Sequence, residues 1–113
     1  MNKKQNAIYE VVDAVVECCS YERPDGSRNI TRQMVLSPER ISENCDMTRC
    51  ILVRQLKVMG YTNESIADIL GRSETTIRDM FQRGDNYDLS SYAYHIAAAE
   101  AAIKLRILMG KEQ

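Results

Sequence analysis

Three side chains at helical spacing, Thr75, Arg78 and Gln82, carry the groups best suited to recognition chemistry in this sequence. Residues three and four apart share one face of an α-helix. A hydroxyl, a guanidinium and a carboxamide on one face suit the base edges of the DNA major groove, where arginine pairs with guanine and glutamine with adenine. The neighbouring acids Glu74 and Asp79 can accept from cytosine or exclude unsuited sequences.

Other groups in the same region suit the phosphate backbone rather than the bases. We expect backbone N–H groups at Asn63 and Glu74 to lie at helix N-termini, where an anion is favoured, with Ser73 at the start of the second helix. The cationic side chains that we expect to contact phosphates are Arg54, Lys57, Arg72 and Arg83.

These groups would be positioned by two short helices joined by a tight turn. Thr62 and Ser73 are N-cap residues, and Gly71 follows the first apolar run, where a turn requires positive φ. The small Ala67 stands where two helices would cross closely. The apolar positions are Ile66, Leu70, Ile77 and Met80. The sequence thus predicts helices from Asn63 to Leu70 and from Glu74 to about Gln82, the second ended by Gly84.

The N-terminal part predicts a helix from about Lys4 to Cys19, because apolar residues recur at helical spacing opposite Glu10, Asp13 and Glu17. A strand over Tyr9–Val16 is the competing interpretation, since valines favour strands.

Residues 20–36 contain the turn signal Pro24-Asp25-Gly26 and predict either a short β-hairpin or an irregular loop. This segment carries three arginines, so a DNA-contacting arm is an alternative to a solvated loop.

Between this segment and the central motif, two helix starts are expected. Ser37-Pro38-Glu39 predicts a short helix that ends near Asn44. Asp46 then caps a longer helix from Met47 to about Met59, which Gly60 ends.

The C-terminal part predicts a polar linker, Gly84–Leu89, and a long helix to about Met109, capped by Ser90 or Ser91. This helix has apolar residues on more than one face. We expect one seam to form a homodimer interface, and the alternative is that the whole helix packs onto its own chain. The seam consists of Ile96, Ala99, Ile103 and Ile107.

The expected fold is therefore all-α, in a single domain of 113 residues. Residues 1–46 form the N-terminal helix, basic loop and short helix, residues 47–83 a tri-helical helix-turn-helix core, and residues 84–113 the linker and C-terminal helix. Net charge is −1, but residues 47–83 carry six basic and four acidic side chains. A basic excess there suits a phosphate-facing surface, although it is small for a monomeric DNA binder.

Other functional classes find little support. The four cysteines lack the spacing of common zinc sites, and we interpret them as packed thiols rather than as metal ligands. The single histidine, His95, has no neighbours at catalytic spacing, and no phosphate-binding glycine loop occurs. We therefore expect a non-enzymatic protein without cofactor, metal or small-molecule ligand. The absence of a signal peptide and of a membrane span predicts a cytoplasmic protein that does not contact membranes.

The stretch from Gly60-Tyr61-Thr62 through Leu70-Gly71-Arg72-Ser73 to Thr76-Ile77-Arg78 resembles the three-helix DNA-binding domain of response-regulator effectors, sigma factor region four and many transposases. The resemblance covers about residues 47–83. It implies that residues 73–83 form the recognition helix. Arg72 departs from the aliphatic residue that is commoner there, and it suits a phosphate contact in transposase-type versions.

The sequence thus predicts a sequence-specific protein that binds duplex DNA, either a small transcriptional regulator or an accessory factor of a mobile element. The alternative is a protein-interaction module that keeps the tri-helical fold without binding nucleic acid. The near-neutral charge and acidic ends favour this alternative.

Overall fold

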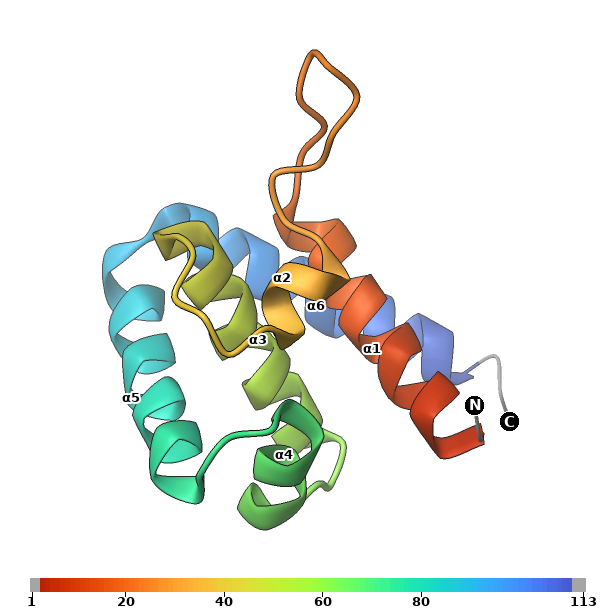
Figure 1. Ribbon diagram of the computed structural model, residues 1–113, viewed down its shortest axis with the longest axis vertical. Coiled ribbons are helices and arrows are strands. Elements are labelled where there is room, and N and C mark those ends of the chain that lie inside the picture. Colours follow the sequence, from red (N-terminus) through yellow and green to blue (C-terminus); the bar gives the residue numbers. More distant parts are fainter. Residues whose placement is uncertain (1–2, 111–113) are drawn as a thin grey trace.

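The chain is described by a computed structural model that covers residues 3–110, with side chains from Ala7 onwards. Within this range the fold is all-α, as predicted (Figure 1). In chain order the helices are α1 (Lys3–Cys19), α2 (Arg32–Leu36), α3 (Glu43–Val58), α4 (Asn63–Leu70), α5 (Glu74–Ser90) and α6 (Tyr92–Gly110).

Helix α1 packs against α6 and α3 through its valine-rich face. Val11, Val12 and Val15 are buried, whereas Glu10 and Asp13 are exposed. The predicted helix is confirmed and the strand alternative over Tyr9–Val16 is wrong. Burial of the apolar stripe outweighs the modest preference of valine for strands.

Helix α3 occupies the centre of the molecule and contacts every other helix. The predicted break near Asn44 is wrong, because α3 runs unbroken from Glu43. Its N-cap is Ser42, whose hydroxyl accepts from Cys45 N at 3.1 Å. Asp46 therefore lies inside the first turn, where an acid favours the helix dipole but does not cap.

Residues 20–31 form a loop that projects from one end of the molecule (Figure 1). It contains one isolated bridge, between Glu22 and Arg28, so the irregular-loop alternative describes it better than a hairpin. Inside the loop, Asn29 Oδ1 accepts from Tyr21 N at 2.6 Å. The short helix α2 that follows was not expected; Thr31 caps it by accepting from Met34 N at 3.3 Å.

The end of α2 explains a second error in the prediction. Ser37 is the C-cap of α2, and residues 38–42 are not helical, so no helix starts at Pro38. A serine–proline pair also occurs naturally after a helix, because proline cannot continue the preceding one.

Helices α4 and α5 begin where predicted. Thr62 accepts from Ser65 N at 3.1 Å, and Ser73 accepts from Thr76 N at 3.2 Å. Gly71 ends α4 with φ of 64°, a left-handed conformation that glycine adopts without steric cost. The two helices pack against each other and against α3. Their predicted apolar positions Ile66, Leu70, Ile77 and Met80 are all buried.

The predicted end of α5 is wrong, because the helix continues through Gly84 to Ser90. The expected linker, Gly84–Leu89, is therefore helical. Gly84 is buried, and a Cβ atom built there would lie 2.9 Å from Tyr94 Oη and 3.5 Å from Cys50 Cβ. This glycine allows α5, α6 and α3 to approach closely rather than ending a helix.

We expect Gly84→Ala to be destabilising even though alanine favours helices by about 1 kcal/mol over glycine. The new methyl group would collide with the hydroxyl of Tyr94, which is buried without a hydrogen-bond partner among the described residues. Tyr94→Phe alone should not destabilise the protein, since the lost hydroxyl is unpaired. Thermal melts of both variants and the double variant should show Tyr94→Phe rescuing Gly84→Ala. A double variant no more stable than Gly84→Ala would exclude this packing.

Helix α6 begins after Ser91, whose hydroxyl accepts from Tyr94 N at 3.1 Å. Of the two predicted caps, Ser91 is therefore the one used. Tyr94, Ala101 and Leu105 bury one face of α6 against the rest of the chain. Among the described residues, no helix combines the length and apolar character that crossing a membrane requires.

Candidate nucleic-acid interface

The candidate recognition face lies on the outer side of α5. Its buried side places Ile77 and Met80 in the core. Because these residues fix the rotation of the helix, five polar side chains face solvent: Glu74, Thr75, Arg78, Asp79 and Gln82. Within the described part of the chain, Arg78 forms neither a hydrogen bond nor an ion pair with another side chain. Its guanidinium is therefore available to an external partner.

Most of the cationic residues that we expected on the phosphate-facing surface form contacts with other residues of their own chain. Arg54 forms an ion pair with Asp85, and Lys57 Nζ donates to Asn63 Oδ1 at 3.0 Å. Counting charges over residues 47–83 could not reveal the first of these contacts, because Asp85 lies beyond that segment. The basic excess is thus smaller at the surface than in the sequence.

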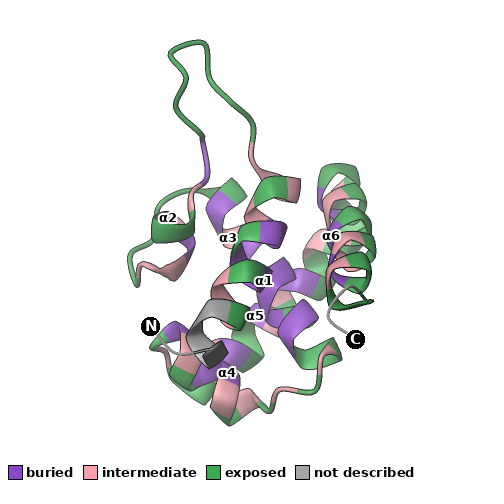
Figure 2. Ribbon diagram, turned by 90° about the vertical axis from the view of Figure 1, so that its right-hand side faces the viewer, coloured by how far each residue is buried: buried purple, intermediate pink, exposed green. Residues whose placement is uncertain are grey.

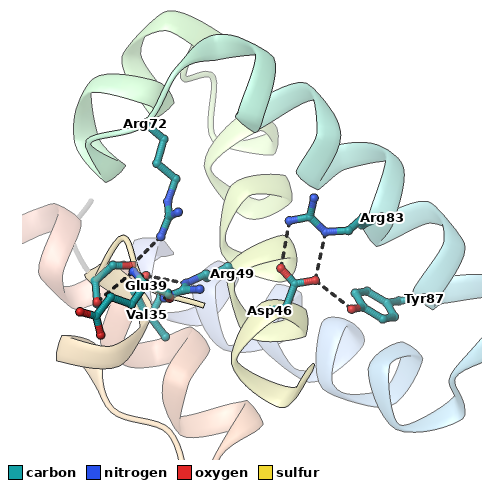
Figure 3. A network of polar contacts seen from close by, with 8 residues as sticks. Val35, Glu39, Asp46, Arg49, Arg72, Arg83 and Tyr87 are labelled. Atoms are coloured by element: carbon teal, nitrogen blue, oxygen red, sulfur yellow. Dashed lines mark hydrogen bonds and ion pairs between the residues drawn. The ribbon is translucent and has the colours of Figure 1, made fainter. Parts of the chain in front are cut away.

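Arg83 is likewise held by a carboxylate from outside residues 47–83. Its Nε and one terminal nitrogen donate to Asp46 at 3.0 and 2.9 Å, and Tyr87 Oη donates to the same carboxylate at 2.8 Å (Figure 3). Burial opposes ionisation of Asp46, but the bonds from Arg83 and Tyr87 and the arginine charge bring its pKa below the usual value. Burial and the bond to Asp46 raise the pKa of Tyr87 to about 12. Arg83 therefore joins α5 to α3, while 42% of its side chain stays exposed.

Arg72 and Arg49 meet at the segment between α2 and α3 (Figure 3). Arg49 is 5% exposed and donates to four backbone oxygens, those of Met34, Val35, Ser37 and Glu39. One terminal nitrogen of Arg72 donates to the Ser37 oxygen at 2.6 Å. The turn arginine predicted to contact phosphate is thus half-buried against its own chain.

Arg49 received no role in the sequence analysis, although the sequence contains a signal for it. It lies four residues after Cys45 and four before Val53, both buried, so it shares the apolar face of α3. An arginine on such a face requires acceptors for its five N–H groups. The acceptors belong to a segment without regular structure, which the sequence pattern does not place.

The cysteines are free thiols on the inner faces of α1 and α3. Burial raises the pKa of Cys50 to about 12 and that of Cys19 to about 11, so both remain protonated at neutral pH. Protonated thiols are poor nucleophiles and poor metal ligands. Over residues 3–110, no three histidine, cysteine or acidic side chains cluster in a way that could hold a metal ion.

The seam predicted on α6 consists of exposed residues, and Figure 2 shows α6 at the edge of the molecule. Ile96 is 40% exposed, Ile103 59% and Ile107 57%, and Ala99 between them is also exposed. The alternative in which the whole helix packs onto its own chain is therefore wrong for this face, although the opposite face does pack inward.

No family model, curated protein or solved structure matches the chain. Its chemistry must therefore be inferred from the surfaces themselves. The α5 face offers hydrogen-bonding groups on a rigid element, the segment around Arg49 and Arg72 offers positive charge, and the α6 seam offers an exposed apolar stripe. Each surface is suited to binding.

Proposed function

We propose that the protein binds duplex DNA with α5 as the recognition helix, and that α3, α4 and α5 act as a helix-turn-helix unit. The observation that carries this proposal is the outward polar face of α5, which follows the tight turn at Gly71. A helix about 10–12 Å wide fits the major groove, where base edges are distinguishable. Arg78, Gln82 and Thr75 would read bases, and the N-terminus of α4 would lie near a phosphate.

The function that suits such a unit is that of a small transcriptional regulator or an accessory factor of a mobile element. The position of the helix-turn-helix unit relative to the loop at residues 20–31 decides whether the loop could contact the same DNA. The loop and the α4–α5 turn lie at opposite ends of the molecule in both views (Figure 1 and Figure 2). The loop therefore does not flank the proposed recognition face, and the proposal does not use it as a DNA-contacting arm.

A protein-interaction module is the second candidate, and one specific observation favours it. The exposed face of α5 carries two acidic side chains, Glu74 and Asp79, but only one basic side chain, Arg78. Since phosphate neutralisation supplies most non-specific DNA affinity, this face would depend on flanking cations and on direct base contacts. A salt-dependent mobility-shift assay on mixed genomic DNA distinguishes the candidates. An interaction module would give no shift at any salt concentration.

Arg78→Ala is the variant that tests the recognition helix. We expect it to weaken binding to a specific site by about 1–3 kcal/mol, the value of one bidentate arginine–guanine contact. Because Arg78 has no partner within the described chain, the fold should be unaffected. Arg106→Ala, an exposed arginine on α6, is the matched control. Unchanged affinity in Arg78→Ala, with a normal melt, would remove α5 from the proposed interface.

We also propose that the α6 seam holds two copies of the chain together. A two-fold partner presents the same apolar stripe, so Ile96, Ile103 and Ile107 of each copy would cover those of the other. Ala99 would allow the helices to approach closely. Two copies on one duplex would double the phosphate contacts of a weakly basic unit, with half-sites about 34 Å apart or a multiple of that distance.

Ile103→Glu should convert this dimer to a monomer, because it places a charge at the middle of the seam. Light scattering of the wild type at tens of micromolar should give twice the mass of one chain, and the variant should give one. Glu100→Gln, a neighbouring exposed substitution, should leave the dimer intact. A wild-type mass of a single chain would rule the dimer out.

A further inference from the structure

A polar cleft runs between α5 and the segment that joins α2 to α3. Its charged lining consists of Arg40, Arg49, Arg72, Arg83, Glu43 and Asp46. Four guanidinium groups therefore meet two carboxylates. The cleft lies on the flank of α5, where Thr76 and Tyr87 also line it, and not on the outer face that carries Arg78.

The positive charges in this cleft are only partly balanced. Asp46 is committed to Arg83. Arg49 and Arg72 are held by backbone carbonyl oxygens, which satisfy N–H donors without neutralising a charge. Both donate to the same Ser37 oxygen, at 2.8 and 2.6 Å, so two guanidinium groups lie side by side (Figure 3). Arg40 is exposed and has no ion-pair partner among the described residues.

A second observation concerns the donors of Arg72. Its Nε is buried and has no hydrogen-bond partner in the described part of the chain. A buried donor of a charged group without an acceptor is costly, and such groups normally find one. Burial lowers the pKa of Arg72, and the charges of Arg49 and Arg83 lower it further. Together these observations show that the positive charge of Arg72 is held beside other positive charges, without a carboxylate bonded to it.

We infer that this cleft binds a phosphate group, held by Arg72 and Arg40 in the field of the buried Arg49. A phosphate oxygen would accept from the guanidinium of Arg72, and its charge would balance the arginine pair. Thr76 adds a hydroxyl at the cleft wall. The phosphate can come from the backbone of a duplex or from a free phosphate-bearing molecule. The first source rests on the proposed function, whereas the second does not.

The test begins with inorganic phosphate and the intact protein, without DNA. In a titration at constant ionic strength, the Nε–H resonance of Arg72 should shift and saturate, and the thermal midpoint should rise. Arg40→Gln and Arg72→Gln should each abolish most of the rise, whereas Arg106→Gln on α6 should retain it. Comparing variants removes the general stabilisation that phosphate gives any protein by exclusion from its surface.

A second arm identifies the source. If a duplex supplies the phosphate, Arg40→Gln should reduce the slope of log affinity against log salt by about one. If the slope is unchanged while the phosphate response persists, a free phosphate-bearing molecule is the ligand. An unmoved Arg72 resonance in both phosphate and DNA, with variants identical to wild type, would overturn the site. Failure of the wild type to bind any duplex would instead overturn the proposed function and leave the phosphate titration valid.

Discussion

Arg49→Met is expected to lower the free energy of unfolding by about 3–5 kcal/mol, the largest effect of any single substitution considered. Four backbone oxygens between Met34 and Glu39 lose the bond from Arg49 in this variant. The Ser37 oxygen keeps Arg72 and the Met34 oxygen keeps Ser37 N, whereas those of Val35 and Glu39 keep no other donor among the described residues. Val35 is buried, so the loss of the bond to its oxygen is expected to be the costliest. Chemical denaturation at neutral pH measures the loss.

Two further variants separate hydrogen bonding from charge and from side-chain packing. Arg49→Lys keeps the charge but loses the planar fork that reaches several acceptors at once, so it should recover only part of the stability. Arg106→Met places the same methionine at an exposed position of α6 and should leave the denaturation midpoint unchanged. If Arg49→Met unfolds at the wild-type denaturant concentration, the four contacts contribute nothing net.

The segment that Arg49 holds was harder to predict from the sequence than α4 and α5. Helix positions set by local signals were predictable: the caps Thr62 and Ser73, the left-handed Gly71 and the apolar spacing of α4 and α5 depend on residues close in sequence. The break near Asn44, inside α3, was predicted wrongly, because Ser37 and Asp46 each match a cap pattern. Their actual roles, the end of α2 and an ion pair with Arg83, depend on distant residues.

The role of Gly84 likewise depends on residues distant in sequence. Glycine normally ends a helix, and only the approach of Tyr94 from α6 and Cys50 from α3 makes it a packing residue within one. The candidate site divides in the same way. Exposure of Arg78 and Gln82 follows from helical periodicity, whereas the partners of Arg54 and Arg83 follow from tertiary contacts.

Ala67→Leu should destabilise the protein by about 1–3 kcal/mol, through overpacking where α4 meets its neighbours. Ala67 is 5% exposed, and α4 packs against both α3 and α5. A larger side chain would have to displace one of these helices. The Ala67 oxygen also accepts from Arg72 N at 2.9 Å, so movement of α4 would shift the turn that leads into α5. A thermal melt should show a midpoint at least 4 °C lower, since 1 kcal/mol corresponds to about that shift.

The adjacent Asp68→Leu is the matched control, because it introduces the same side chain on the exposed face of the same helix. It should not lower the midpoint, since it fills no occupied space and removes an acid near the helix C-terminus, where negative charge is unfavourable. The comparison also bears on recognition. If Ala67→Leu keeps its fold but shifts α4 against α5, its DNA affinity should fall together with its stability. In Asp68→Leu the DNA affinity should change only through the removal of one negative charge. Equal midpoints for the two variants would mean that α4 does not pack tightly against α3 and α5 at this position.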